Sequence, residues 1–283
     1  MRTWKNLYII LLLSLSFGTV TDIDGNTYET VQIGDQLWMA ENLKVTHYND
    51  GSDIQYVQSE SSEPGVWENL STGAYGYYND DQTHLDTYGN LYNWYVVDDD
   101  RGVCPDGFHV PSDEEFMELE MYLGMSEEEA NLNGFRGTDE GSKLAGNNDL
   151  WDNDDLENNS EFGTSGFSAF PAGDRNDGNG FYISMGFYGD FWSSSELSSN
   201  YAWYRSLSYY SSNVNRSNYD KRIGFSIRCL ADEITTGCTH LNATNYDETA
   251  NVDDGSCEYE TVQIGHQVWM AENLKATHYR NGD

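Results

Sequence analysis

The chain has 283 residues, with 14 Lys and Arg against 48 Asp and Glu, a formal net charge of −34 and a sequence pI near 4.1. An acidic surface of this kind repels nucleic acid phosphates and anionic membranes, so we expect no nucleic acid partner. Aromatic residues make up 14% of the sequence, which excludes a disordered chain and indicates a packed core.

Residues 1–18 are predicted to be a secretory signal peptide. Arg2 and Lys5 supply positive charge ahead of Leu7 to Phe17, an apolar run too short to span a bilayer, and Ser16 and Gly18 form a small-residue cleavage site. An uncleaved anchor is the alternative. Because no other segment is apolar for long enough to cross a membrane, we expect a secreted or cell-surface protein without a membrane span after cleavage.

The first elements after this segment are predicted from turn residues and alternation. Asp24-Gly25-Asn26 is a hairpin turn signal, and Thr27 to Ile33 alternates in the manner of a strand. Trp38 to Leu43 suits a short helix or turn packed on the core. Ile54 to Ser71 is predicted to be a loop.

Tyr, Trp and Gly then dominate two short stretches, Ala74 to Asn79 and Tyr88 to Trp94. Rings at this density predict core positions with polar tips, and a platform on which a sugar stacks is the alternative. Next comes Ser112-Asp113-Glu114-Glu115, a capping box that predicts a helix from about Asp113 to Leu123. Ser126 to Glu129 repeats the signal and predicts a second, shorter helix.

The rest of the first domain is predicted to be loops followed by strands. Gly134 to Gly166 is rich in Gly, Asn and Asp and is predicted to form long loops. Short strands and turns follow, with Asn213 to Asp220 as the turn before the last strand, Ile223 to Leu230. Early helices and late antiparallel strands predict an α+β fold.

The four cysteines predict two disulfides. Cys238 and Cys257 close a short loop rich in Asn and Asp, which leaves Cys104 for Cys229. A zinc site is the weaker alternative, because the chain has no C-x-x-C pair. We expect residues 233–258 to form a disulfide-closed insert.

The insert also offers a candidate calcium site. Asn245, Asp247, Asp253 and Asp254 provide hard oxygen ligands within one small loop, and backbone carbonyls or waters would complete the shell. The alternative is that these residues serve only as turn formers. No other cofactor is expected.

An internal repeat follows the insert. Tyr259 to Gly282 copies Tyr28 to Gly51, and 19 of the 24 positions are identical. Residues 259–283 are therefore predicted to begin a second copy of the domain that residues 19–232 form, and we expect the sequence to be truncated inside that copy.

Several motifs together resemble the Fibrobacter succinogenes major paralogous domain, a family of secreted or surface bacterial proteins. They are IGDQLWMAENL, GNLYNWY, GVCPDGFHVPSDEEF, FSAFPAGDR, FWSSSE and IGFSIRCL, between about Asp22 and Leu230. The layout is also distantly similar to the sulfatase-modifying superfamily, and that resemblance implies a C-type-lectin-like fold with short helices and twisted antiparallel strands. That enzyme class needs a reactive cysteine pair, whereas the cysteines here are predicted to form disulfides.

The expected function is a binding module for extracellular glycans or surface proteins. In a lectin-like fold, loops at strand ends carry ligands, which makes Asp174, Arg175, Trp192 and Glu196 candidate ligand-binding residues; buried hydrogen-bonded corners are the alternative. No catalytic motif is present, so no catalytic residue is assigned. An enzyme related to the sulfatase-modifying superfamily, an unrecognised hydrolase and a structural spacer remain alternative functions.

Overall fold

The structure is a computed structural model that describes residues 18–59, 65–232, 235–250, 252–264 and 266–270. The predicted signal peptide and the end of the repeat, residues 271–283, lie outside the described residues. Thr19–Ile234 forms one compact unit, and the described residues from Thr235 onward belong to a second. No helix in the described ranges is long and apolar enough to cross a membrane.

The first unit is built from antiparallel sheets and short helices, as the α+β prediction requires. A five-stranded sheet has the order β1-β2-β3-β14-β7, a four-stranded sheet has the order β11-β12-β13-β8, and smaller sheets have the orders β4-β5-β6 and β10-β9. Their strands are β1 (Thr19–Thr21), β2 (Thr27–Ile33), β3 (Gln36–Met39), β4 (Gln55–Tyr56), β5 (Ala74–Gly76), β6 (Leu91–Tyr92), β7 (Phe108–His109), β8 (Gly134–Arg136), β9 (Asp174–Arg175), β10 (Tyr182–Ile183), β11 (Tyr188–Ser198), β12 (Tyr201–Ser208), β13 (Ser211–Asp220) and β14 (Leu230–Ala231). Among the described strands of this unit, every strand-to-strand pairing is antiparallel except β4 with β5.

The helices in the described ranges are short, and three of the six α-helices begin with a side-chain cap. They are α1 (Leu85–Tyr88), α2 (Trp94–Val97), α3 (Asp113–Tyr122), α4 (Glu127–Ala130), α5 (Glu140–Leu144) and α6 (Asp155–Asn158), with 3₁₀ turns η1 (Trp67–Asn69), η2 (Tyr78–Asp80), η3 (Gln82–His84) and η4 (Asn148–Leu150). Both predicted capping boxes are present: Ser112 and Glu115 begin α3, and Ser126 and Glu129 begin α4.

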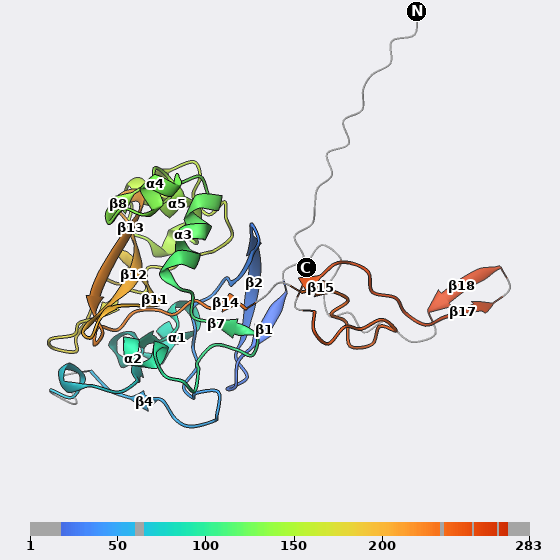
Figure 1. Cartoon of the computed structure of the whole chain (residues 1–283), viewed down its shortest axis with the longest axis horizontal. Helices are drawn as coiled ribbons and strands as arrows, with labels where there is room; N and C mark the ends of the chain where they lie inside the picture. Colours follow the sequence, from blue (N-terminus) through green and yellow to red (C-terminus); the bar gives the residue numbers. More distant parts are fainter. Residues whose placement is uncertain (1–17, 60–64, 233–234, 251, 265, 271–283) are drawn as a thin grey trace, which may run out of the picture. The chain divides into compact units, whose positions relative to one another are not determined.

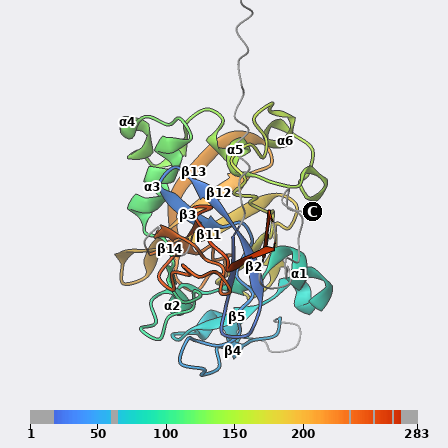
Figure 2. The same ribbon diagram turned by 90° about the vertical axis from the view of Figure 1, so that its right-hand side faces the viewer.

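Helix α3 is anchored to the four-stranded sheet by a buried ion network. Its Asp113 accepts hydrogen bonds from Arg205 of β12 at 2.6 Å and from Arg216 of β13 at 2.5 Å. Its Glu120 accepts from Arg205 at 2.7 Å and from Arg136 of β8. Figures 1 and 2 show α3 close to β13. The network fixes which face of the sheet the helix covers.

Two hydrophobic clusters form most of the core. The first lies between β2, β3, α3, α5 and the four-stranded sheet, and it includes Trp38, Phe116, Phe167 and Val214. The second surrounds the disulfide Cys104–Cys229, which joins the segment before β7 to the segment before β14. The pairing favoured by the sequence is therefore the one in the structure.

Five local predictions were wrong. Of the predicted last strand, Ile223 to Leu230, only Leu230 lies in a strand, β14, while Gly224, Phe225 and Ser226 form isolated bridges. Trp38 and Met39 lie in strand β3, where they pair with Val31 and Thr30 of β2. Gln55 and Tyr56 of the predicted Ile54–Ser71 loop form β4, and that segment also contains η1. The Gly134–Gly166 segment contains β8, α5, η4 and α6, because Leu144, Trp151 and Leu156 are buried in the core. Asn213 to Asp220 forms most of β13 rather than a turn.

The second unit contains the Cys238–Cys257 disulfide, strands β15 (Thr236–Gly237) and β16 (Val252–Asp253), which pair in parallel, and a hairpin of β17 (Thr261–Ile264) and β18 (Gln267–Met270). This hairpin repeats the register of β2 and β3: Val262 is opposite Trp269 as Val31 is opposite Trp38. Trp38 is fully buried, whereas Trp269 is 54% exposed. In the part of the repeat that the structure describes, the local pairing is therefore reproduced but the burial of this tryptophan is not.

Candidate functional site

The four-stranded sheet has two chemically different faces. Alternate residues of β12 and β13 point to opposite sides, and Arg205 and Arg216 point toward α3. The opposite side we call the polar aromatic face. Residues on this side lie directly opposite one another on neighbouring strands, or two positions apart along one strand. They are Tyr188, Asp190 and Trp192 of β11, Tyr204 and Ser206 of β12, Asn215, Ser217 and Tyr219 of β13, and Phe135 of β8.

An aromatic group lies at each end of this face. At one end Tyr204 stacks on Phe225 with ring centroids 4.7 Å apart, and Tyr219 lies 6.2 Å from Tyr204. At the other end Tyr210, which follows β12, lies 5.8 Å from Phe135 and 6.3 Å from Tyr188. Tyr219, Phe135 and Tyr210 are 38%, 43% and 42% exposed, so both ends present ring surface to solvent.

Small polar groups lie between the aromatic ends. Ser206 is opposite Asn215, and Tyr204 is opposite Ser217. Asn215 Oδ1 is buried and accepts no hydrogen bond within the described part of the chain. Because that oxygen is buried, a ligand would instead meet partly exposed polar residues between the rings, such as Ser217.

One buried carboxyl group belongs to the polar aromatic face, and a second borders it. Asp190 of β11 is directly opposite Ser206, and Asp174 of β9 follows Gly173, which bridges to Gly189 of β11. Burial raises the pKa of Asp190, and the nearby charge of Asp174 adds to this effect. Burial likewise raises the pKa of Asp174 to about 6, although a hydrogen bond with Ser184 acts against the increase. Burying two carboxyl groups close together destabilises their ionised forms. Raised carboxyl pKa values of this kind are typical of functional sites.

The predicted ligand-binding residues are not brought together as one set. Asp174 borders the polar aromatic face, and Trp192 belongs to that face but is fully buried, with its indole N–H donating to the Tyr92 carbonyl at 2.9 Å. Arg175 is fully buried; it donates to the carbonyls of Val57 and Gln58 and lies over the Trp67 ring. Arg175 and Trp192 therefore agree with the alternative prediction, that these residues form buried, hydrogen-bonded corners.

Glu196 lies beyond the regular pairing of β11 and forms an ion pair with Lys221. Its side chain is half exposed, whereas Lys221 is buried against the Trp94 ring at 4.0 Å. The contacts of Glu196 therefore point to a role in positioning Lys221.

The other residues of the polar aromatic face were not predicted from sequence motifs, although the local composition of the sequence indicates most of them. From Leu197 to Tyr219 the chain has no Asp or Glu, in a protein with 48 acidic residues, and Tyr, Ser and Asn dominate the segment. Tyr, Ser and Asn are the residues that antibody paratopes use for adaptable polar contacts. The low-charge segment corresponds to β12 and β13.

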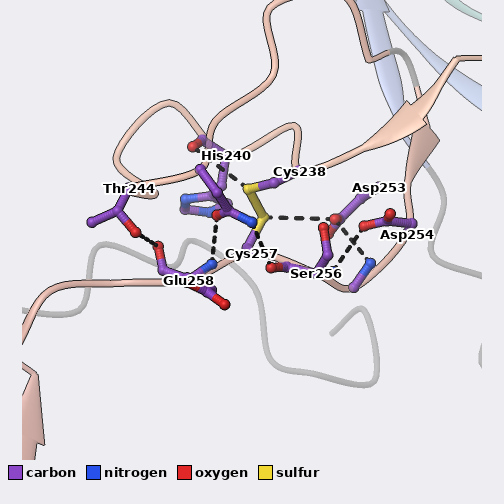
Figure 3. The surroundings of a disulfide bond; sticks show 10 residues. Cys238, His240, Thr244, Asp253, Asp254, Ser256, Cys257 and Glu258 are labelled. Carbon is purple, nitrogen blue, oxygen red and sulfur yellow. Dashed lines mark hydrogen bonds between the residues drawn. A yellow bond between two sulfur atoms is a disulfide. The ribbon is translucent and has the colours of Figure 1, made fainter.

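The four candidate calcium ligands of the insert hold local turns, and Figure 3 shows two of them, Asp253 and Asp254. Asp247 Oδ1 accepts from Thr249, Asp253 Oδ1 from Gly255 and Asp254 Oδ1 from Ser256, all from backbone N–H groups. Asn245 donates to the Ser256 carbonyl and accepts from the Glu258 N–H.

In the described residues no three His, Cys, Asp or Glu side chains are grouped to hold a metal ion. The contacts of the insert agree with the turn-forming alternative. Calcium binding there stays a prediction, which calorimetric titration of the chain with calcium, before and after Asp253→Ala, can check.

Comparison with known proteins identifies the family. No curated protein and no solved structure matches the chain. The sequence pattern of the Fibrobacter succinogenes major domain matches residues 31–231, which is most of the chain and includes every residue of the polar aromatic face. The chain therefore belongs to the Fibrobacter succinogenes major domain family.

Proposed function

We propose that residues 19–232 form a secreted or cell-surface binding module with a C-type-lectin-like arrangement, and that the module recognises glycans through the polar aromatic face. In this proposal residues 1–18 are a signal peptide, residues 233–258 a disulfide-closed insert, and residues 259–283 the start of a second copy of the module. The two disulfides are consistent with an extracellular module, because disulfides persist in oxidising compartments.

The observation that carries the proposal is the combination of exposed rings with acceptors on one sheet face. The faces of Tyr and Phe rings are electron-rich, so they attract the positively polarised C–H groups of a sugar ring. The hydroxyl groups of the exposed residues Tyr219 and Tyr210, and of the partly exposed Ser217, can exchange hydrogen bonds with sugar hydroxyls. Ligand sites typically combine apolar surface with a few placed polar groups in this way.

A glycan array probed with the whole chain tests the proposal, and the β12–β13 hairpin offers a matched pair of variants. Tyr219→Ala removes a ring from the polar aromatic face. Tyr201→Ala removes a ring of similar exposure, 45% against 38%, from the other side of the same hairpin. We expect Tyr219→Ala to abolish glycan retention and Tyr201→Ala to leave it unchanged. Equal effects of the two variants, or no retention by the unmodified chain, would contradict the proposal.

A second candidate function is hydrolysis, and the specific observation in its favour is Asp174. A carboxyl group with its pKa raised to about 6, near a second carboxyl group, resembles the acid of a glycoside hydrolase. A broad hydrolase screen tests this function. If the chain shows turnover that Asp174→Asn abolishes, catalysis rather than binding is its function.

The sulfatase-modifying alternative is not favoured, since Cys104 and Cys229 are buried in a disulfide. A spacer would show neither binding nor turnover.

A further inference from the structure

We infer that the ligand of the polar aromatic face is an uncharged pyranose oligosaccharide that extends from Tyr219 to Phe135. This inference rests on the proposed function and adds two properties of the glycan, its length and its charge. Each property follows from a separate observation.

The required length follows from the separation of the two aromatic ends. Tyr219 and Asn215 lie four residues apart on β13, which corresponds to about 14 Å along a strand, and Phe135 of β8 lies directly opposite Asn215. One pyranose ring is too small to contact both ends. A monosaccharide can therefore use only one aromatic group, whereas an extended chain can stack on both and pass over Ser217 and Asn215 between them.

The end at Tyr219 is the better candidate for the primary contact. Tyr219 lies 6.2 Å from Tyr204 and 6.0 Å from Phe225, and the partly exposed Ser217 lies two residues away on the same face of β13. A sugar bound there meets both a ring and the Ser217 hydroxyl. The Phe135 end offers the rings of Phe135 and Tyr210 and so adds mainly stacking.

The absence of charge follows from the distribution of ionised groups. The two basic residues of β12 and β13, Arg205 and Arg216, point to the α3 side and are engaged by Asp113. Asp174, whose pKa is about 6, is ionised at neutral pH and would repel a uronic acid or sulfated polymer, and the net charge of −34 adds to that repulsion. A neutral sugar avoids this cost and still donates hydroxyl hydrogen bonds.

Isothermal titration of the whole chain with neutral gluco- and xylo-oligosaccharides of one to six units, beside oligogalacturonates of equal length, tests both properties. We expect the affinity for one of the neutral series to rise at least tenfold from one unit to four, and oligogalacturonate to bind at least tenfold more weakly. Phe135→Ala should remove the gain with length and leave the affinity for the shortest bound sugar unchanged. Tyr219→Ala should weaken every length, and Tyr219→Phe should retain most of the binding.

The outcomes separate this inference from the proposed function. Length-independent affinity, or tighter binding of oligogalacturonate, would overturn the inference and leave glycan binding intact. Absence of heat with every sugar, together with an empty glycan array, would overturn both. Because Tyr219 and Phe135 are exposed, we expect their variants to fold; an unchanged thermal unfolding midpoint checks this, and Tyr201→Ala serves as the control for the loss of a tyrosine.

Discussion

The ionised carboxylate of Asp174 destabilises the folded domain at neutral pH. It is 8% exposed, and burial raises its pKa from 3.8 to about 6. Because the folded-state pKa lies above the unfolded value, the folded state holds the proton more tightly. Stability should therefore fall as the pH rises from about 4 to about 6 and stay lower above that window. Such a cost is common where function requires a buried polar group.

Asp174→Asn should remove this cost, because asparagine keeps the shape and an acceptor oxygen but does not ionise. A shift of about two pH units corresponds to roughly 2–3 kcal/mol. We expect the variant to exceed the unmodified chain in free energy of unfolding by about that amount at pH 7.5 and to match it at pH 4. Urea unfolding at both pH values measures this, with Asp106→Asn in an exposed turn as the control. A destabilised Asp174→Asn at pH 7.5 would show that the carboxylate is required by the fold.

At the scale of elements, α3 connects the capping motif to the sheet that carries the polar aromatic face. Glu120 is fully buried between Arg136 and Arg205, and these arginines come from β8 and β12. Removing one partner of a buried ion pair leaves the other charge uncompensated and typically costs about 3–5 kcal/mol.

We therefore expect Glu120→Gln to lower the free energy of unfolding by roughly that amount. Glu118→Gln is the matched control, because Glu118 lies on the same helix and is exposed; it should change stability by less than about 0.5 kcal/mol. Chemical denaturation followed by tryptophan fluorescence measures both. A similar small effect of the two variants would mean that the network is replaceable by neutral hydrogen bonds.

The same helix shows what could be predicted from the sequence and what could not. Its start was predictable because Ser112 and Glu115 are three residues apart and act locally. The burial of Asp113 and Glu120 was not, because their arginine partners lie 16 to 103 residues away along the chain. Strand β13 was mistaken for a turn because the side chains of Asn213, Asn215 and Ser217 are typical of turns. Polar residues occur there because these three positions of β13 are only partly buried.

At the scale of the whole molecule, the two disulfides constrain different parts of the chain. Cys104 and Cys229 are separated by 125 residues and lie in the second hydrophobic cluster, whereas Cys238 and Cys257 are separated by 19 and lie in the second unit. Closing a longer loop removes more conformational freedom from the unfolded chain. The first disulfide should therefore contribute more stability, and it should stabilise the family domain.

The double variant Cys104→Ala/Cys229→Ala should lower the free energy of unfolding of the Thr19–Ile234 unit by about 2–5 kcal/mol. Cys238→Ala/Cys257→Ala should leave that transition unchanged, because those residues belong to the other compact unit. Denaturation followed by tryptophan fluorescence reports mainly on the first unit, since Trp38, Trp67, Trp94 and Trp192 are buried there. Coupled loss of stability in the second double variant would show that the two units unfold together, and the insert would then be part of the domain rather than an appendage to it.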